Sequence, residues 1–131
     1  MVLQVGVKAF LRNKEGKFLM LKRSEQYKIG GEWDIPGGRI DPGTPLLENL
    51  KREIQEEAGL KLTREPQLIA AQDILKPDKH VVRLTYLGLI EGKPKLSEEH
   101  TDFQWFSLEE LKQLENLDSF IKELIDKKLV H

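Results

Sequence analysis

The sequence predicts an α/β fold in which a mixed β-sheet is covered by helices. Three features carry this prediction: residues 3–12 alternate between apolar and polar side chains as a strand does, an amphipathic helix follows at 45–58, and helices end the chain after further strands. Because strands and helices do not alternate regularly, a mixed sheet is favoured over a wholly parallel one. The chain has 131 residues, so we expect a single domain over residues 1–131.

The first half of the chain is expected to begin with two strands. Residues 3–12 form the first strand, and a turn at 13–16 leads to a second at 18–21, which is apolar on both faces and therefore central in its sheet. A polar loop at 24–32 contains Gly30 and Gly31. The segment WDIPGGRI that follows predicts a short extended piece broken by proline and glycine.

The clearest helix covers Pro45–Ala58. Thr44 is expected to cap it, and Pro45 suits the first helical position, where no amide hydrogen bond is lost. Gly59 can end the helix because glycine readily adopts the left-handed conformation found there.

The second half of the chain is expected to add three strands and two helices. The expected elements are strands at 67–75, 80–90 and 103–106, a polar loop at 93–101, and helices that begin at 108 and cover about 118–128. Ser107 and Glu110 have the spacing of a capping box for the first of these helices. The last helix has one apolar face, made by Phe120, Ile121, Leu124 and Ile125.

The composition narrows the classes of function. With 33% charged and 39% hydrophobic residues, we expect a strongly solvated surface. A formal net charge of −1 gives no basic field, so neither a nucleic acid polymer nor a membrane is an expected partner. The chain has no cysteine, which excludes disulfides and cysteine nucleophiles and makes a cytoplasmic protein our expectation. No apolar run approaches a membrane span, and the first residues alternate like a strand rather than a signal peptide.

Three glutamates share the helix at 45–58. With Arg52 taken as zero and 100° per residue, the apolar stripe of the helix spans about 120° to 240°. Glu56, Glu53 and Glu57 then lie at about 40°, 100° and 140°. Glu57 therefore lies inside the edge of the apolar stripe, where an unpaired carboxylate costs several kcal/mol.

These carboxylates outnumber the cations that can neutralise them. Arg52 lies four residues after Glu48 and four before Glu56, which are good spacings for helical ion pairs, but one guanidinium leaves an excess of negative charge. A hard divalent cation, Mg²⁺ or alternatively Mn²⁺, resolves this because it binds carboxylate oxygens together with water and phosphate. The simpler interpretation is a solvated acidic face.

The Pro36–Gly38 turn precedes this helix and leaves its backbone groups bare. A main-chain carbonyl there could bind the metal while amides face phosphate oxygens. Taken alone, such a turn is more often only a turn.

In these segments the chain resembles the Nudix hydrolase family and its MutT-like members. The family's box runs Gly, five residues, Glu, seven residues, Arg-Glu-apolar-any-Glu-Glu-any-Gly-apolar, and the chain matches it at Gly38, Arg52, Glu53, Ile54, Glu56, Glu57, Gly59 and Leu60. The resemblance extends to LKRS and WDIPGG before the helix and to FQWFSLEEL after it. One position departs: Thr44 stands where the family has a glutamate that supports the box arginine, and we expect Glu48 to replace it.

The resemblance implies a Nudix fold, a mixed β-sheet sandwiched between helices (α/β/α). It also implies Mg²⁺-dependent attack of water on a diphosphate linkage in a nucleoside diphosphate derivative, which suits a metal that stabilises phosphoryl charge and acidifies water. By the same resemblance, the metal ligands are Glu56, Glu57 and the Gly38 carbonyl. Glu53 is a ligand or the base, and Arg52 orients it.

Residues outside the box are expected to complete the site. An acidic residue commonly does so in the family as ligand or general base, and we assign Glu99 to this role, with Glu98 as the near alternative. Arg23 could meet a phosphate or ribose together with the backbone of Gly37 and Gly38. The simpler interpretations are solvated loop glutamates and a surface arginine.

The aromatic and histidine residues receive no role in the chemistry. Trp33 and Trp105 are expected to pack in the core rather than stack on a base. The histidines are scattered along the chain, so we assign no metal role to them: His80, His100 and His131.

Three functions are consistent with the resemblance. The leading one is hydrolysis of a nucleoside triphosphate, oxidised or non-standard ones included, to the monophosphate and pyrophosphate. The second is hydrolysis of a nucleotide sugar of the ADP-ribose type. The third is a non-catalytic module that senses a nucleotide, as the loss of glutamate at Thr44 suggests. A monomer and a homodimer are both compatible with the sequence.

Overall fold

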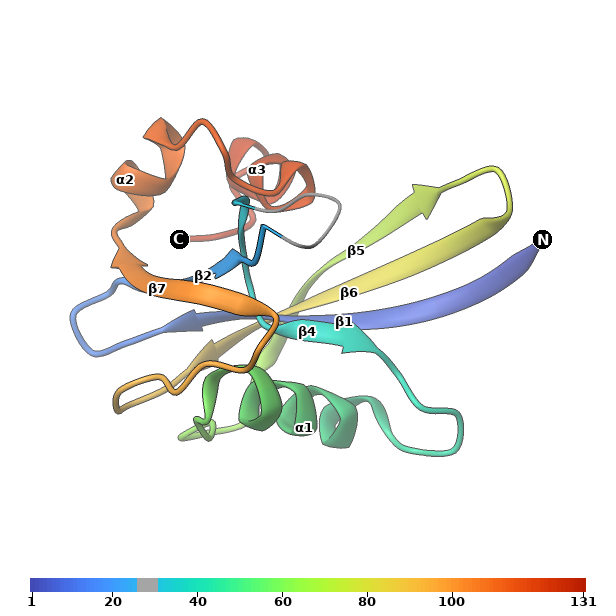
Figure 1. Cartoon of the computed structure of the whole chain (residues 1–131), viewed down its shortest axis with the longest axis horizontal. Helices are drawn as coiled ribbons and strands as arrows, with labels where there is room; N and C mark the ends of the chain where they lie inside the picture. Colours follow the sequence, from blue (N-terminus) through green and yellow to red (C-terminus); the bar gives the residue numbers. More distant parts are fainter. Residues whose placement is uncertain (26–30) are drawn as a thin grey trace.

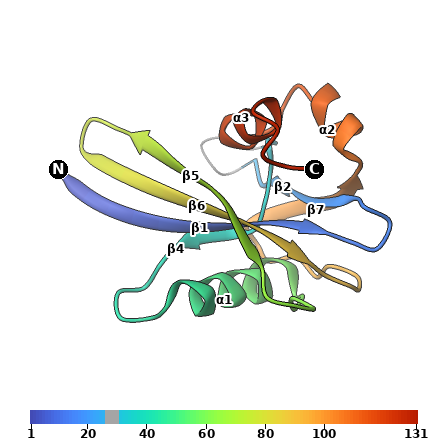
Figure 2. The ribbon, with the colours of Figure 1, turned by 180° about the vertical axis from the view of Figure 1, so that it is seen from behind.

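The computed structural model describes residues 1–25 and 31–131, and it has a mixed sheet with helices on both faces (Figures 1 and 2). Helix α1 covers one face, and α2 and α3 cover the other, which confirms the predicted α/β/α class. The elements are β1 (Val2–Arg12), β2 (Phe18–Arg23), β3 (Trp33–Asp34), β4 (Gly37–Arg39), α1 (Leu46–Ala58), β5 (Gln67–Leu75), β6 (Lys79–Leu89), β7 (His100–Phe106), α2 (Leu108–Gln113) and α3 (Ser119–Asp126).

The sheet is mixed because its two longest strands run parallel. Strands β1 and β6 pair in parallel along their whole length, so that Gly6 lies opposite Arg83 and Lys8 opposite Thr85. All other strand pairs are antiparallel, and the strand order among the described residues is β3-β2-β1-β6-β5, with β4 also on β1 and β7 also on β2. Strand β2 thus has three neighbours, which confirms its predicted central place.

Two hydrophobic cores hold the helices to the sheet. Leu50, Ile54 and Ala58 of α1 are fully buried against one face. On the other face the apolar residues of α2 and α3 pack with Trp33, and Trp105 packs at the edge of the α1 core, so both tryptophans lie in the core as predicted. The residues of α2 and α3 in this core are Leu111, Ile121, Leu124 and Ile125.

The beginning of α1 differs from the prediction. Pro45 is the residue before the first helical turn, and the Thr44 side chain makes no capping hydrogen bond. Asn49, which is fully buried, instead fixes the chain before the helix: its amide nitrogen donates to the carbonyls of Thr44 and Pro45 at 2.8 and 2.9 Å, and its oxygen accepts from the Asp41 amide at 2.9 Å. The end of α1 is as predicted, since Gly59 has a φ of 66°.

The C-terminal elements follow the predicted order with shifted ends. The capping box of Ser107 and Glu110 is present, and Asp118 caps α3 by accepting hydrogen bonds from two amides of its first turn. Strand β7 begins at His100, so the predicted loop at 93–101 is shorter than expected. Of the predicted loop at 24–32, residues 26–30 with Gly30 lie outside the described part of the chain. Within residues 1–25 and 31–131, no helix has the length and apolarity that crossing a membrane requires.

Candidate active site

Glu57 is a buried carboxylate, as the sequence predicts. Only 6% of the residue is exposed, and its Oε1 accepts a hydrogen bond from the Gly37 amide at 3.3 Å. Burial raises the pKa of Glu57 to about 8, with the charges of Glu53 and Glu99 adding to the rise and Lys8 and the Gly37 amide opposing it. The fold therefore holds a carboxyl group that favours protonation until a cation approaches.

Because Glu57 is buried, we expect the stability of the metal-free protein to depend on pH. Because the pKa of Glu57 is raised from 4.5 to about 8, the folded state binds its proton more tightly, and stability falls as pH rises through that window by on the order of 5 kcal/mol. We therefore expect Glu57→Gln to be more stable than the wild type at pH 9 in EDTA, with the difference vanishing near pH 5. Urea unfolding at both pH values measures this, with Glu65→Gln, an exposed loop glutamate, as the control. Equal stabilities at pH 9 contradict the burial argument.

The backbone of Gly37 and Gly38 packs closely against its surroundings. A Cβ at Gly37 would lie 2.2 Å from the Val7 carbonyl oxygen, and one at Gly38 would lie 2.7 Å from Glu53 Oε1. At Gly37 the close atom is backbone, so only glycine fits there, whereas a side chain at Gly38 would displace the Glu53 carboxylate. The turn thus presents bare backbone to the α1 carboxylates, as the sequence suggests.

The predicted carboxylates line one cavity of about 340 Å³. Glu53 is 14% exposed at its side chain and Glu56 59%, so the three glutamates of α1 range from buried to open. The loop before β7 brings further carboxylates to the same cavity from a distant part of the sequence. Its lining residues are Glu53, Glu56, Glu57, Ser97, Glu98 and Glu99. Glu99, but not Glu98, also lines the neighbouring cavity described below.

Arg52 pairs with carboxylates on both sides, but not with the one predicted. Its Nη2 lies 3.1 Å from Glu53 Oε1 and its Nε 3.6 Å from Glu56 Oε1, while Nη1 donates to Asp41. Glu48 is not among its ion-pair partners, so the expectation that Glu48 replaces the missing box glutamate is wrong. Asp41 takes this place because the loop before α1 folds back over the helix, where the Asn49 side chain holds the Asp41 amide.

Substitutions of Asp41 and Glu48 are expected to affect kcat differently. Asp41→Asn is expected to lower kcat for the reaction proposed below by about tenfold, because Arg52 then loses a partner that fixes it against Glu53. Glu48→Gln, matched in chemistry and four residues from Arg52, is expected to leave kcat unchanged. Steady-state kinetics of the two variants measures this, and a larger loss in the Glu48 variant contradicts the assignment.

A second cavity of about 310 Å³ adjoins the first and contains positive charge. It shares Glu57 and Glu99 with the first cavity, and Lys8 and Arg23 add an ammonium and a guanidinium. Arg23, which the sequence analysis expects to meet a phosphate or ribose, lines this cavity, and that role stays a prediction. The lining residues are Lys8, Arg23, Asp34, Gly37, Gly38, Glu57, Glu99 and His100.

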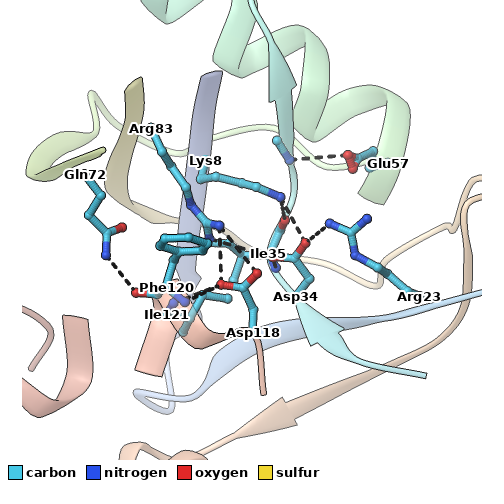
Figure 3. Close-up of polar contacts among 11 residues, drawn as sticks. Lys8, Arg23, Asp34, Ile35, Glu57, Gln72, Arg83, Asp118, Phe120 and Ile121 are labelled. Carbon is cyan, nitrogen blue, oxygen red and sulfur yellow. Dashed lines mark hydrogen bonds and ion pairs between the residues drawn. The ribbon is translucent and has the colours of Figure 1, made fainter. Parts of the chain in front are cut away.

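Asp34 organises the cations of this cavity (Figure 3). It is 1% exposed, and its carboxylate binds Lys8 Nζ at 3.1 Å and the Arg23 guanidinium, with Arg83 Nη2 at 3.9 Å. These three cations outweigh the effect of burial and hold the pKa of Asp34 well below its usual range. Sequence reasoning missed Lys8 and Asp34. The alternation of β1 places Lys8 on a polar face that is read as solvent-facing, and that face is the floor of a cavity.

His100, to which the sequence analysis assigns no metal role, lies beside the predicted carboxylates. It is 8% exposed, lines the basic cavity, and offers a ring nitrogen within 4.8 Å of ligand atoms of both Glu57 and Glu99. Burial, together with the charges of Lys8 and Arg23 and against that of Asp34, lowers the pKa of His100 to about 4, so the ring is neutral near pH 7. The sequence could have indicated that His100 lies in the site, because His100 directly follows Glu99, which was assigned to it.

The donor set fits a hard divalent cation. Carboxylate and carbonyl oxygens are the ligands that Mg²⁺ and Mn²⁺ prefer, and the predicted glutamates line one cavity, while ligand atoms of Glu57, Glu99 and His100 lie within 4.8 Å of one another. A cation there would reverse the raised pKa of Glu57. Glu53, Glu56, Glu57, Glu99 and the Gly38 carbonyl are the groups available to hold it.

The site combines a buried carboxylate on a helix, a glycine turn against it and a basic cavity beside it, and comparison with known proteins assigns the chain to a family. The model of the NUDIX domain family matches residues 2–128, and the chain belongs to this family. It is 29% identical over 113 residues to the nucleoside triphosphatase NudI of Escherichia coli, covering 77% of this chain and 80% of that protein. It is 32% identical over 111 residues to the asymmetrical bis(5'-nucleosyl)-tetraphosphatase of Mus musculus, covering 78% and 71%.

The fold agrees with a solved member of the same group. The crystal structure of the MutT protein from Methanosarcina mazei Go1 superposes with a TM-score of 0.86 at 31% identity and covers 96% of this chain and 92% of that one. The match therefore includes both faces of the sheet and the α1 helix that carries the carboxylates.

Proposed function

We propose that this protein hydrolyses a nucleoside triphosphate to the monophosphate and pyrophosphate with Mg²⁺ as cofactor. The observation that carries the proposal is the junction of two cavities. A carboxylate-lined cavity suited to a cation meets a cavity with Lys8 and Arg23 suited to phosphate, and Glu57 and Glu99 lie in the wall of both. A diphosphate linkage with a bound cation carries complementary charge to each side.

The basic cavity binds the phosphate chain. Lys8 Nζ donates to Asp34 and to the Ile35 carbonyl at 3.1 Å each, which fixes the ammonium toward the cavity. Arg23 is held by the same carboxylate. Lys8, Arg23 and Asp34 together carry one net positive charge, and this charge stabilises the phosphoryl oxygens as negative charge develops on them.

The carboxylates have two further roles, which are metal binding and proton transfer. Mg²⁺, when bound, supplies charge stabilisation at phosphorus and acidifies water. Glu56, Glu57 and the Gly38 carbonyl would hold it, and Arg52 orients Glu53 through the 3.1 Å contact between them. Glu99 is the general base that takes the proton of the attacking water, because it lies in both cavities and forms no ion pair with any described residue.

Product analysis tests this proposal. The purified protein is incubated with Mg²⁺ and a panel of nucleoside triphosphates, oxidised guanine triphosphates, dinucleoside polyphosphates and nucleotide sugars, and the products are separated by ion-exchange chromatography. The expected result is a monophosphate and pyrophosphate from a triphosphate. The triphosphatase relative named above supports this choice of substrate.

Other products would contradict the proposed function, each in a distinct way. Two monophosphates from a nucleotide sugar identify a nucleotide-sugar pyrophosphatase. Tight nucleotide binding without turnover of any compound identifies a sensor module.

Glu99→Gln is expected to lower kcat while Glu65→Gln, on an exposed loop, leaves it unchanged.

A further inference from the structure

Glu57, Glu99 and His100 bring three possible metal-ligating atoms together. Within residues 1–25 and 31–131 they are the one group of three or more histidine and acidic side chains whose ligand atoms all lie within 4.8 Å of one another. All three residues line the basic cavity. Glu53 and Glu56, the other carboxylates that α1 contributes to the site, are not members of this group. The group therefore marks a place beside the α1 carboxylates rather than among them.

The His100 imidazole has bonding capacity that no described residue uses. The residue is 8% exposed, and its Nδ1 is buried without a hydrogen-bond partner among residues 1–25 and 31–131. A buried polar atom without a partner is unfavourable, and a bound ion is one of the few reasons for which a fold retains it. Because a metal cation is smaller than a water molecule, the atoms that converge on its site can have almost no surface that water reaches. A cation held together with Glu57 and Glu99 would use this capacity.

The local backbone explains how two consecutive residues reach the same cavity. Consecutive residues of a regular strand point to opposite faces of the sheet. Glu99 precedes β7, and its carbonyl accepts from the Ser24 amide at 2.9 Å. His100 is the first residue of β7 and lies opposite Arg23, where the register of β2 and β7 shifts. Such an irregularity redirects a side chain, so Glu99 and His100 line one cavity together.

The donor set indicates the kind of cation. Two carboxylate oxygens and one imidazole nitrogen suit a transition-metal dication, whereas Mg²⁺ prefers oxygen ligands alone. An imidazole without a charged partner is neutral above about pH 7, so two carboxylates balance the two charges of the cation. Bonds of about 2.0–2.2 Å place two ligands of one ion at most about 4.4 Å apart. The present limit of 4.8 Å is close to this value, so small side-chain rotations complete the site.

We propose that Glu57, Glu99 and His100 form a cation site with a nitrogen ligand, and that this site takes a transition-metal dication in preference to Mg²⁺. It is separate from the oxygen-only set that includes Glu56 and the Gly38 carbonyl, and Glu57, whose carboxylate has two oxygens, is shared between them. One oxygen of Glu99 stays free for the proton transfer proposed above. The inference rests on the proposed function, because both cations would meet the same phosphate chain.

Pulsed EPR spectroscopy with Mn²⁺ tests the inference on the protein purified without a histidine tag. With one equivalent of Mn²⁺ in excess Mg²⁺ at pH 8, the wild type is expected to show coupling of Mn²⁺ to an imidazole nitrogen, and His100→Gln to lose it. The chain has three histidines, so His80→Gln/His131→Gln leaves His100 alone and is expected to keep the coupling without any change in the site. Absence of coupling in the wild type, or its loss in this double variant, overturns the inference.

Competition between Mn²⁺ and Mg²⁺ measures the preference of the site. His100→Gln is expected to weaken Mn²⁺ binding by at least about tenfold, because even the outer partners of metal ligands contribute roughly 10- to 100-fold to affinity. Its affinity for Mg²⁺ is expected to change little. His80→Gln is the matched control, since His80 is partly exposed and pairs with Asp73 at 2.6 Å. Equal losses of Mn²⁺ and Mg²⁺ affinity in His100→Gln contradict a nitrogen ligand.

The same measurements separate this inference from the proposed function. If triphosphates are hydrolysed with Mg²⁺ but bound Mn²⁺ shows no coupling to nitrogen, the inference fails and the proposed function stands. If His100 is coupled to Mn²⁺ and no triphosphate is hydrolysed with either metal, the proposed function fails and the cation site stands.

Discussion

Replacing Glu57 with glutamine is expected to lower kcat for triphosphate hydrolysis by at least about 10²-fold, the usual loss when one charge-stabilising group is removed from a site. The substitution keeps the shape of the side chain and its acceptor for the Gly37 amide, which now lies 3.3 Å from Oε1. It removes the negative charge at the junction of the two cavities. In the proposed mechanism, the cation would then lose its most buried ligand.

The stability of this variant distinguishes loss of chemistry from loss of fold. Because the ionised Glu57 opposes folding, the glutamine variant is expected to unfold no more easily than the wild type at pH 8 in EDTA. Steady-state kinetics with saturating Mg²⁺ measures the rate, and a kcat near that of the wild type contradicts the assignment of Glu57 as a ligand.

Replacing Asp34 with asparagine is expected to cost about 3–5 kcal/mol of stability, the usual effect of removing one partner from a buried ion pair. Asp34 neutralises Lys8 and Arg23 in a place that is 1% exposed, and without its charge these cations repel one another. Urea unfolding at pH 7 measures the change. Asp126→Asn, on the exposed end of α3, is the matched control.

The stability that Asp34 contributes depends on pH in the opposite direction to the contribution of Glu57. Three cations hold the pKa of Asp34 well below its usual range, so its contribution is present at all pH values above about 4 and is lost only as pH falls further. The wild type and Asp34→Asn should therefore differ by a constant amount from pH 6 to 9. A difference under about 1 kcal/mol in that range contradicts the central place of Asp34 in the cluster.

Local pattern was sufficient to predict the order of the elements and much of the site. The 3.6-residue period of α1 places Glu57 at the edge of the apolar stripe, and the structure confirms its burial. Gly37, Gly38 and Glu57 meet because the turn and the helix are close in sequence. The carboxylates of α1 and Glu99 were assigned to one site by resemblance, and they line one cavity.

The parts that sequence did not predict depend on long-range pairing. The parallel register of β1 and β6 brings Gly6 opposite Arg83, and no local pattern fixes which strands pair. Lys8 and Arg83 alternate like solvent-facing residues, because period-two alternation cannot distinguish a wet surface from the polar floor of a cavity. Helical spacing favoured Glu48 as the partner of Arg52, but the loop before α1 brings Asp41 there instead.

The rate of pyrophosphate release from the nucleoside triphosphate that the substrate panel selects, measured as a function of Mg²⁺ concentration, tests the central claim most directly. We expect no release in EDTA, a rise to saturation with added Mg²⁺, and one nucleoside monophosphate formed for each pyrophosphate. Release at an equal rate in EDTA, or formation of the nucleoside diphosphate and inorganic phosphate, would contradict it.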